Sequence, residues 1–398
     1  MSSEWSETTW GEIATLEYGK AIRDYQNASG GVPVYGTNGP IGWHHTPLCN
    51  SDGVVIGRKG AYRGVHYSPK PFFVIDTAFY LKPKIELSAR WAYYCLLTYD
   101  INGMDSGSAI PSTSRDEFYK LPVKVPALAE QNRIVEVLSL LDDRITLLRE
   151  TNATLEAIAQ ALFKSWFVDF DPVRAKAEGR QPEGMDATTA ALFPDSFEES
   201  ELGLVPKGWR HVSLKEVTAI FDSKRVPLSG QERDKRKGTY PYYGAAALMD
   251  WVDGYLFDGV YLLLGEDGSV ADTAGYPVTQ YVWGKIWVNN HAHVLQGKAG
   301  VSTEHLMLTL QQTNISPYIT GAVQAKLSQT NMWRIPFLRS RDEVAIAFGE
   351  AIAPLFNSVR HNHEQAQTLT QLRDTLLPRL ISGQLRLPEA EALVAEAV

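Results

Sequence analysis

Apolar residues follow two different periods along this chain of 398 residues. In residues 1–127 and 207–339, short β-branched and aromatic runs, such as GVVIG (53–57) and VYLLLG (260–265), alternate with Gly-bearing turn signals. Such runs are typical of strands. Each of these two regions is therefore predicted to form a mostly β domain with a few short helices.

Two other regions carry apolar residues at alternating spacings of four and three. The first series is Ile134, Leu138, Leu141, Ile145, Leu148, Asn152, Leu155 and Leu162, and the second is Leu355, Val359, Asn362, Leu369 and Leu376. This period predicts a coiled coil of long helices at 128–170 and 340–385, with the two Asn residues fixing the register. A single amphipathic helix on a globular core is disfavoured, because each region is much longer than an ordinary globular helix. Ser340 and Glu343 are spaced as a capping box, and Gly383 is a stop signal.

The two halves of the chain resemble each other. VPVYGTNGPIGW (32–43) matches YPYYGAAALMDW (240–251) at an offset of 208 residues, and the DGV segments at 52–54 and 258–260 match at 206. Residues 106–123 match 320–337 at an offset of 214. This order predicts a tandem duplication and an α+β fold: two similar mostly-β domains joined by an antiparallel coiled coil with a pseudo-two-fold axis. Residues 171–206 are predicted to be a linker, and 386–398 a tail.

The charge distribution follows this division. The whole chain has a formal net charge of -8, which argues against a nucleic-acid partner. The windows 1–130 and 205–340, however, carry net charges of -1 and +3, whereas 131–204 and 341–398 carry -7 and -3. The basic residues of the two domains cluster in glycine-bearing loops, where Lys and Arg can approach phosphates and guanine edges.

The sequence contains no familiar catalytic motif. It has no phosphate-binding loop, no dinucleotide fingerprint and no nucleophile elbow. Three histidine pairs, among them His291 and His293, invite a metal interpretation, but surface or structural histidines are favoured. Glu266 and Asp267 could accept from a cytosine amino group, bind a cation or cap a turn, and the turn is favoured. Two cysteines, no signal peptide and no bilayer-spanning apolar run favour the cytoplasm. We expect a chain that catalyses nothing by itself and binds no metal or other cofactor.

The sequence resembles the specificity subunits of type I restriction-modification systems along almost its whole length. GLVPKGWRHVSL (203–214) is similar to the family's entry into a target-recognition domain. KLPVKVPALAEQNRIVEVLSLLDDRI (120–145) resembles the passage from that domain into a conserved helix, and IAQALFKSWFVDFDPV (158–173) and TLLPRLISGQL (375–385) resemble the ends of the two conserved helices. The second helix lacks a counterpart of Glu130 and Gln131.

The resemblance implies a non-catalytic subunit that binds double-stranded DNA. Each target-recognition domain would read one half of an interrupted site, and the coiled coil would fix the gap. Two modification (methyltransferase) subunits would carry S-adenosylmethionine and methylate adenine. Restriction subunits would join them for translocation and cleavage that use ATP and Mg²⁺. No membrane partner is implied.

Candidate DNA-contacting residues lie in three loops of each domain. They are Tyr35, Thr37, Asn38, Arg58, Lys59, Arg63, Ser106 and Ser108 in the first domain, and Lys224, Arg225, Arg233, Lys235, Arg236, Lys237, Tyr243, Gln324 and Lys326 in the second. Asn and Gln suit adenine edges, and Arg suits guanine or phosphate. Tyr35, Gly36 and their counterparts can equally persist for folding, because shared residues cannot distinguish two half-sites. Discrimination is expected where the domains differ, as at 58–59 against 266–267.

Two other classes of function are compatible with parts of the sequence. A carbohydrate-binding protein with exposed aromatic residues, or a scaffold without a ligand, would share the β-rich domains and the coiled coil. Neither accounts for basic glycine loops on two spaced domains. Salt dependence separates them, because binding through phosphates weakens steeply with salt.

Overall fold

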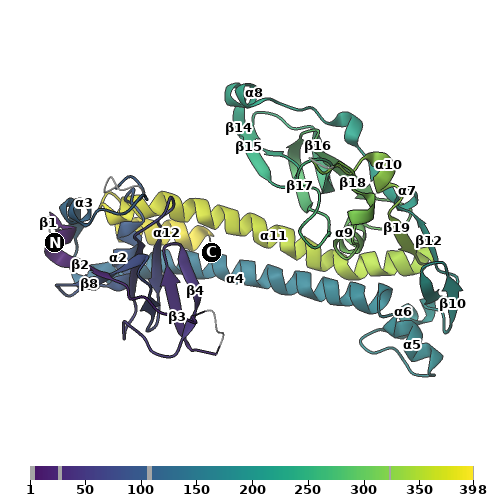
Figure 1. Cartoon of the computed structure of the whole chain (residues 1–398), viewed down its shortest axis with the longest axis horizontal. Helices are drawn as coiled ribbons and strands as arrows, with labels where there is room; N and C mark the ends of the chain where they lie inside the picture. Colours follow the sequence, from purple (N-terminus) through teal and green to yellow (C-terminus); the bar gives the residue numbers. More distant parts are fainter. Residues whose placement is uncertain (1–4, 26–28, 105–109, 322–323, 398) are drawn as a thin grey trace. The chain divides into compact units, whose positions relative to one another are not determined.

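The structure is a computed structural model that describes residues 5–25, 29–104, 110–321 and 324–397 (Figure 1). The chain divides into two compact units. Unit 1 comprises residues 1–149 and 364–398, and unit 2 comprises residues 150–363. The long helices α4 (Leu128–Phe167) and α11 (Asp342–Ile381) each have 40 residues and contribute one stretch to each unit.

The β-rich domain of unit 1 is closed by its first and last strands. Strand β1 (Ser6–Thr9) pairs antiparallel with β9 (Pro122–Val125). Between them lie a four-stranded sheet, in the order β2 (Ala14–Tyr18), β8 (Ala78–Pro83), β5 (Gly53–Gly57) and β6 (Val65–Ser68), and a three-stranded sheet, in the order β4 (Gly39–His44), β3 (Val32–Gly36) and β7 (Phe73–Val74). The helices are α1 (Trp10–Ile13), α2 (Ala89–Leu96) and α3 (Arg115–Lys120).

The β-rich domain of unit 2 is built on the same plan. Strand β12 (Arg210–Ser213) pairs with β19 (Pro336–Arg339). One sheet of six strands runs in the order β13 (Thr218–Ile220), β18 (Ala292–Gly297), β16 (Phe257–Gly265), β17 (Thr279–Val288), β14 (Lys237–Tyr243) and β15 (Leu248–Val252). The helices are α7 (Leu214–Val217), η1 (Asp222–Lys224), α8 (Gly230–Lys235), α9 (Thr303–Gln311), η2 (Ser316–Tyr318) and α10 (Gln329–Met332).

Strand pairing gives the register of the duplication. Gly57 pairs with Ala78 in unit 1, and Gly265 pairs with Ala292 in unit 2, which gives offsets of 208 and 214. The match of the two DGV segments at an offset of 206 is therefore not the structural register. The single long strand β17 takes the places of both β6 and β7. It pairs antiparallel with β16 as β6 does with β5, and it pairs parallel with β14 as β7 does with β3. The predicted α+β class and internal repeat are confirmed.

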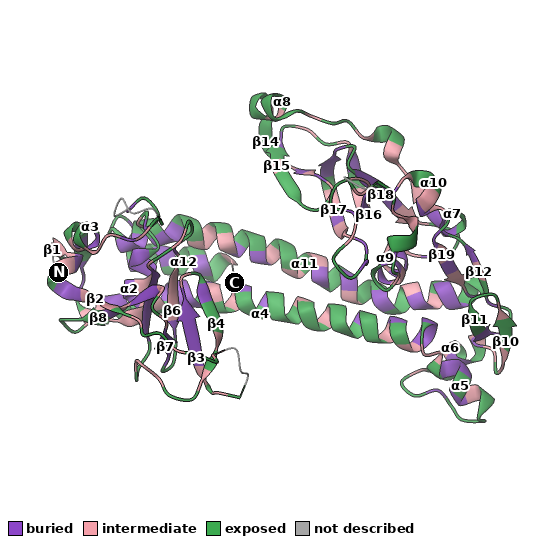
Figure 2. Cartoon of the chain, viewed as in Figure 1, coloured by how far each residue is buried: buried purple, intermediate pink, exposed green. Residues whose placement is uncertain are grey.

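Each unit buries its own apolar core between its domain and its stretches of the two helices. In unit 1, Trp10, Trp91 and Tyr94 pack in one cluster with Leu138 of α4 and Leu376 of α11. In unit 2, an aromatic cluster joins the two helices to the domain; it contains Phe163, Phe167, Phe337 and Phe348. The central strands and the inner helix faces are purple in Figure 2, as expected for sheets covered by helices.

The two long helices pack against each other in both units, and they run antiparallel. In unit 1 Asp142 of α4 forms an ion pair with Arg373 of α11. In unit 2 Asn152 and Asn362 meet, and further along α4 the ring of Phe163 meets Phe348. Of the predicted seam residues, Ile134, Leu138, Leu141, Ile145, Leu148, Val359, Leu369 and Leu376 are buried, and Asn152, Leu155, Leu162, Leu355 and Asn362 are half-buried.

The segments predicted to be a linker and a tail carry regular structure. Helices α5 (Asp171–Ala177) and α6 (Ala187–Leu192) and the hairpin of β10 (Phe197–Ser200) and β11 (Gly203–Pro206) occupy the linker. Helix α12 (Leu387–Ala397) forms most of the tail and buries three apolar residues. Composition alone conceals this, because the few apolar residues of each segment are the ones that pack.

The ends of α11 differ from each other in how well the sequence predicted them. Gly383, with φ of +73°, lies just beyond Ile381 in the left-handed conformation expected of a stop. The predicted capping box is not formed, because the Ser340 hydroxyl donates to the carbonyl of Arg341 and the helix begins at Asp342. Among the described residues, no helix is long and apolar enough to cross a membrane.

Candidate nucleic-acid interface

The tip of the first hairpin holds the candidates Tyr35, Thr37 and Asn38. Tyr35 is only 7% exposed and packs edge-on against Phe72. The Thr37 hydroxyl is 2.9 Å from the carbonyl oxygen of Lys59 and 2.8 Å from that of Thr77, so it braces the neighbouring loop. Of the three, Asn38 is the exposed side chain.

In both domains a side chain packs over the glycine that follows the tyrosine. A Cβ on Gly36 would lie 3.2 Å from the Ile41 side chain, and a Cβ on Gly244 would lie 2.4 Å from the sulfur of Met249. Ile41 and Met249 are equivalent at the offset of 208. Tyr243 is half-buried, and burial raises the pKa of its hydroxyl. These observations favour folding as the reason that Tyr35, Gly36 and their counterparts persist.

The basic loop after β5 contains three candidates in three different environments. Lys59 is exposed. Arg58 is half-buried: its guanidinium lies 4.8 Å from the ring centre of Tyr18 and donates to the carbonyl of Asp76. Arg63 is 3% exposed and donates to three backbone carbonyls, those of Gly60, Asn102 and Met104. The burial of Arg63 argues against the predicted DNA contact, because its donors hold the loop together.

The third predicted loop of the first domain is described only in part. Ser106 and Ser108 lie outside the described residues. Beyond them, the Thr113 hydroxyl donates to the carbonyl of Gly57, and the Thr113 amide donates to the carbonyl of Arg58. This side of the loop is therefore attached to the end of β5.

Four basic candidates of the second domain are held in ion pairs. Arg225 bridges Asp222 and Glu266 and is 12% exposed. Arg233 and Lys237 both reach Asp250, at 3.1 and 2.9 Å. The hydrogen bond from Lys237 lowers the pKa of that carboxyl. In the fourth pair, the Arg236 guanidinium lies 2.8 Å from the Asp253 carboxylate. The 224–237 stretch is thus less of a free basic surface than its sequence predicts.

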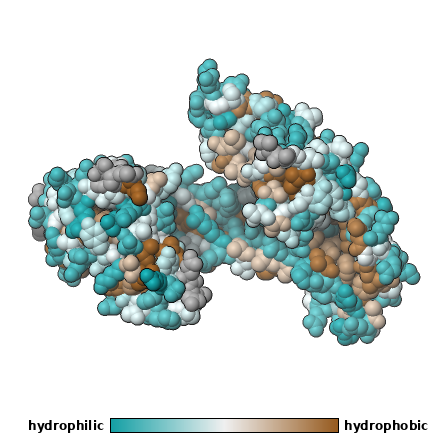
Figure 3. Space-filling view, viewed as in Figure 1, coloured by the Kyte–Doolittle hydropathy of each residue, from teal (hydrophilic) through white to brown (hydrophobic). Residues whose placement is uncertain are grey.

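The remaining candidates of the second domain are exposed. They are Lys224, Lys235, Gln324 and Lys326. Lys235 ends α8, which begins with a complete capping box of Ser229 and Glu232. Figure 3 shows mainly hydrophilic atoms over α8, which suits a surface that faces solvent or a charged ligand.

The loops after β5 and β16 share one backbone scaffold. The amide of Arg58 donates to the carbonyl of Thr77 at 3.0 Å, and that of Glu266 donates to the carbonyl of His291 at 2.8 Å. The amides of Gly60 and Gly268 each donate, at 3.0 Å, to the third loop of their own domain. Isolated bridges join Lys59 to Ser112 and Asp267 to Lys326. The two domains therefore present different side chains at the same backbone positions.

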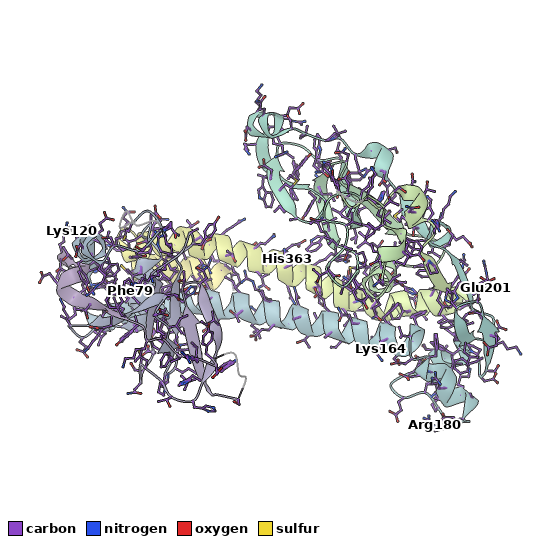
Figure 4. All side chains as sticks on the ribbon, viewed as in Figure 1. Phe79, Lys120, Lys164, Arg180, Glu201 and His363 are labelled. Atoms are coloured by element: carbon purple, nitrogen blue, oxygen red, sulfur yellow. The ribbon has the colours of Figure 1, made fainter. Side chains whose placement is uncertain are left out.

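At the base of this scaffold the two domains have opposite chemistry. In the first domain Arg58 stacks on Tyr18, and the Tyr18 and Phe79 rings are 5.0 Å apart; Phe79 is labelled in Figure 4. In the second domain the equivalent positions of these three residues hold Asp222, Glu266 and His293, whose ligand atoms lie within 4.8 Å of one another. Such a trio could hold a metal ion, but the guanidinium of Arg225 already pairs with both carboxylates. We interpret the cluster as an internal ion-pair network.

The sequence indicated surface or structural roles for His291 and His293, but it did not indicate their carboxylate partners. His293 is 1% exposed, and its ring nitrogens face the Asp222 carboxylate and the Leu327 carbonyl. His291 is 47% exposed and is paired with Asp267. His293 lies within β18, where its side chain is buried, whereas His291 precedes the strand, which begins at Ala292.

Comparisons with known proteins agree with this architecture. The sequence profile of the Type I restriction modification DNA specificity domain matches residues 2–157 and 206–337. The chain is 26% identical over 337 residues to the "Type I restriction enzyme HindI specificity subunit" of Haemophilus influenzae, which covers 69% of this chain and 71% of that protein. It is 22% identical over 331 residues to the "Type I restriction enzyme MjaIX specificity subunit" of Methanocaldococcus jannaschii, with 77% and 71% covered.

A solved structure supports the fold independently. The crystal structure of a type I restriction-modification system S subunit from M. genitalium superposes with a TM-score of 0.61 at 17% identity, covering 95% of this chain and 96% of that one. At this identity the likeness bears on the fold. The profile, by contrast, matches well over half of the sequence and does so once in each repeat. The chain therefore belongs to the family of type I restriction-modification specificity subunits.

Proposed function

We propose that this chain is the sequence-specific DNA-binding subunit of a type I restriction-modification complex, in which each β-rich domain reads one half of an interrupted site. The observation that carries the proposal is the duplicated loop scaffold. Its backbone hydrogen bonds match in the two domains, whereas its side chains differ at 58–59 and 266–267. Such a design suits two domains that meet the same polymer in the same way but read different bases.

The chemistry of this complex would lie on its partners. We assign no catalytic residue and no cofactor to this chain. Two modification subunits would bind S-adenosylmethionine and methylate adenine, and restriction subunits would use ATP and Mg²⁺. Such a complex acts on cellular DNA, so the cytoplasm is the expected location.

The two long helices suit a docking and spacing role. Helix α4 carries six acidic and four basic residues, a net charge of -2, and residues 168–204 after it carry a further -6, so neither offers a basic surface to phosphates. A helix of 40 residues extends roughly 60 Å at 1.5 Å per residue. We therefore assign to α4 and α11 the docking of the modification subunits and the setting of the gap between half-sites.

Methylation mapping tests the proposal. The chain is co-expressed with its modification subunit, and methylated adenines are located throughout the host genome. The proposal predicts one two-part motif with a fixed gap, and loss of that motif when this chain is omitted. Binding of the purified complex to that duplex should weaken by orders of magnitude between about 50 and 200 mM salt. A complex that binds random duplexes as well as any other would refute the proposal.

A further inference from the structure

The two domains place their exposed cations at different positions of the shared scaffold. In the first domain the exposed cation is Lys59, on the loop after β5. In the second domain that position is Asp267, and the exposed side chains around it are His291 and Lys326. His291 takes the place of Thr77, and Lys326 takes the place of Ser112. Each domain thus carries hydrogen-bond donors on this edge, but from different loops.

The acidic residues of the second domain are turned toward these donors. Glu266 is 16% exposed and lies between Arg225, at 2.7 Å, and the Lys326 ammonium, at 3.8 Å. Asp267 is 18% exposed and pairs with the His291 imidazole. Lys326 and His291 themselves are 51% and 47% exposed. A ligand that approaches this edge therefore meets the two donors before it meets either carboxylate.

We infer that His291 and Lys326 are specificity-determining residues of the second domain, held in place by Asp267 and Glu266, and that Lys59 has the equivalent role in the first domain. This inference rests on the proposed function. The ligand chemistry is an acceptor-rich major-groove edge, such as O6 and N7 of guanine, because ammonium and imidazole groups act there as donors. Glu266 and Asp267 are positioning residues; they are not readers of cytosine amino groups.

The inference explains how opposite charges at 58–59 and 266–267 serve one kind of ligand. A bare pair of carboxylates at the edge would repel the phosphates of any duplex. In the second domain both carboxylates are paired with donors, Glu266 with Arg225 and Lys326, and Asp267 with the imidazole of His291. Moving the donors from position 59 to positions 291 and 326 moves the base pair that each donor can reach, so the half-sites differ.

The test uses the complex of the full chain with its modification subunit and the site found by methylation mapping. Binding is measured on duplexes in which each base pair of the site is varied in turn. Lys326→Ala and His291→Ala should each lose about 10-fold or more of the preference at one base pair of one half-site, and leave the other half-site unchanged. Lys59→Ala should do the same for the other half-site.

A matched control lies just beyond the other end of β18. Lys298 is exposed and follows the far end of β18, six residues from its start and so roughly 20 Å from His291. Lys298→Ala should leave every base preference unchanged. If Lys326→Ala and His291→Ala also leave every preference unchanged, or weaken binding equally on all sequences as lost phosphate contacts would, the inference is overturned.

A double variant tests the positioning role. Glu266→Gln keeps a hydrogen-bond acceptor for Arg225 but loses the charge that faces Lys326. It should reduce preference at the base pair affected by Lys326→Ala, and the double variant should lose no more than Lys326→Ala alone. Additive losses would show that Glu266 acts elsewhere. Failure of the proposed function is distinguishable, because then the unaltered complex itself would show no preferred site.

Discussion

His305 is a buried polar side chain that has no polar partner in the structure. It lies in α9, is 1% exposed, and both of its ring nitrogens are without a hydrogen-bond partner. The rings of Phe167, Phe348 and Phe337 surround it at centroid distances of 4.4, 4.9 and 5.5 Å. Burial lowers the pKa of this imidazole to about 3. The aromatic core that joins domain and helices in unit 2 is therefore stable only around a neutral histidine.

This predicts a pH-dependent stability that one substitution removes. The pKa of His305 is 6.5 in the unfolded chain and about 3 in the folded protein, so the folded protein binds this proton more weakly. The contribution of the neutral His305 to stability is therefore complete above pH 6.5 and is lost as the pH falls toward 3. From pH 7 to pH 5 the loss should be about 2 kcal/mol. His305→Leu should abolish that part of the loss and raise stability at pH 7 by about 1 kcal/mol, as measured by denaturant unfolding. The exposed His361→Gln serves as control, and an equal loss in H305L and the unaltered protein would contradict the prediction.

Arg63 is a buried basic candidate whose donors bind backbone carbonyls. Arg63→Met would leave the carbonyls of Gly60, Asn102 and Met104 without their donor and should lower the free energy of unfolding of unit 1 by about 3 kcal/mol. Lys59→Met, at an exposed neighbouring position, should change it by about 0.5 kcal/mol or less. Denaturant unfolding measures both. Equal stabilities of the two variants would show that the buried hydrogen bonds contribute little.

At this scale the sequence predicts residue types better than it predicts their partners. Lys59 and Lys326 are exposed, as expected for candidate DNA contacts. Arg225 was an equally good candidate, but it pairs with Glu266, 41 positions away in the sequence. A charge count contains no information on such long-range pairs, since only the strand register brings them together. The pairing of His291 with Asp267 was not predicted for the same reason.

At the level of secondary-structure elements, the heptad pattern predicts that Asn152 and Asn362 lie on the seam of the paired helices, and the structure gives their hydrogen-bond partners. In unit 2 the Asn152 amide donates to the carbonyl of Val359 at 3.0 Å, and the Asn362 amide donates to the Asn152 side-chain oxygen at 2.9 Å. Polar pairs at such positions favour one register at a cost in stability. We therefore expect this pair to fix the alignment of α4 with α11.

Leucine substitutions test the role of the Asn pair. Asn362→Leu should lower stability by about 1 kcal/mol, because it leaves the Asn152 oxygen without its donor. The double variant N152L/N362L should instead be about 1–2 kcal/mol more stable than the unaltered protein, since two leucines restore an apolar seam. Denaturant unfolding of all three variants gives the comparison. A double variant less stable than either single one would contradict it.

Glu130 and Gln131, which the second helix lacks, attach the first domain to its helix. The Trp5 indole donates to Glu130 at 3.1 Å. Gln131 is 1% exposed; it accepts from the Ser88 amide, which opens α2, and donates to the carbonyl of Pro126. At the offset of 214 the second helix has Val344 and Ala345 in these places, both buried in the aromatic core of unit 2. At these positions the helix is attached to its domain by polar contacts in unit 1 and by apolar contacts in unit 2.

Truncation of Gln131 should therefore act on stability within unit 1. Gln131→Ala should lower the free energy of unfolding by about 2–3 kcal/mol, because a buried amide and a buried carbonyl lose their partners. Asn132→Ala, at an exposed position of the same turn, should change it by about 0.5 kcal/mol or less. The measurement is denaturant unfolding of the full chain. If both variants leave stability unchanged and weaken only the association with the modification subunit, Gln131 and Asn132 belong to the partner interface instead.

For the whole molecule, the duplication is the feature that the sequence revealed best. The offsets of 208 and 214 recur in the strand ladders, because insertions fall in loops and leave paired strands unchanged. The linker and the tail were predicted least well. Phe193 is 2% exposed, and its ring centre lies 5.0 Å from that of Trp166, although the segment around Phe193 is rich in Pro, Glu and Ala. One aromatic residue can order a polar segment, but only when the fold provides a surface for it.

The continuity of α4 and α11 through both units predicts how the recognised site depends on helix length. Removal of one heptad from each helix, at matched positions of the seam, preserves the apolar period and shortens each helix by roughly 10 Å. Under the proposed function the gap should shrink by about three base pairs at 3.4 Å per pair, while both half-sites stay the same. Methylation mapping of the shortened chain with its modification subunit measures both quantities. Removal of four residues from each helix is the control, because it breaks the seam and should abolish a defined motif. Altered half-sites with an unchanged gap would mean that the helices do not set the spacing.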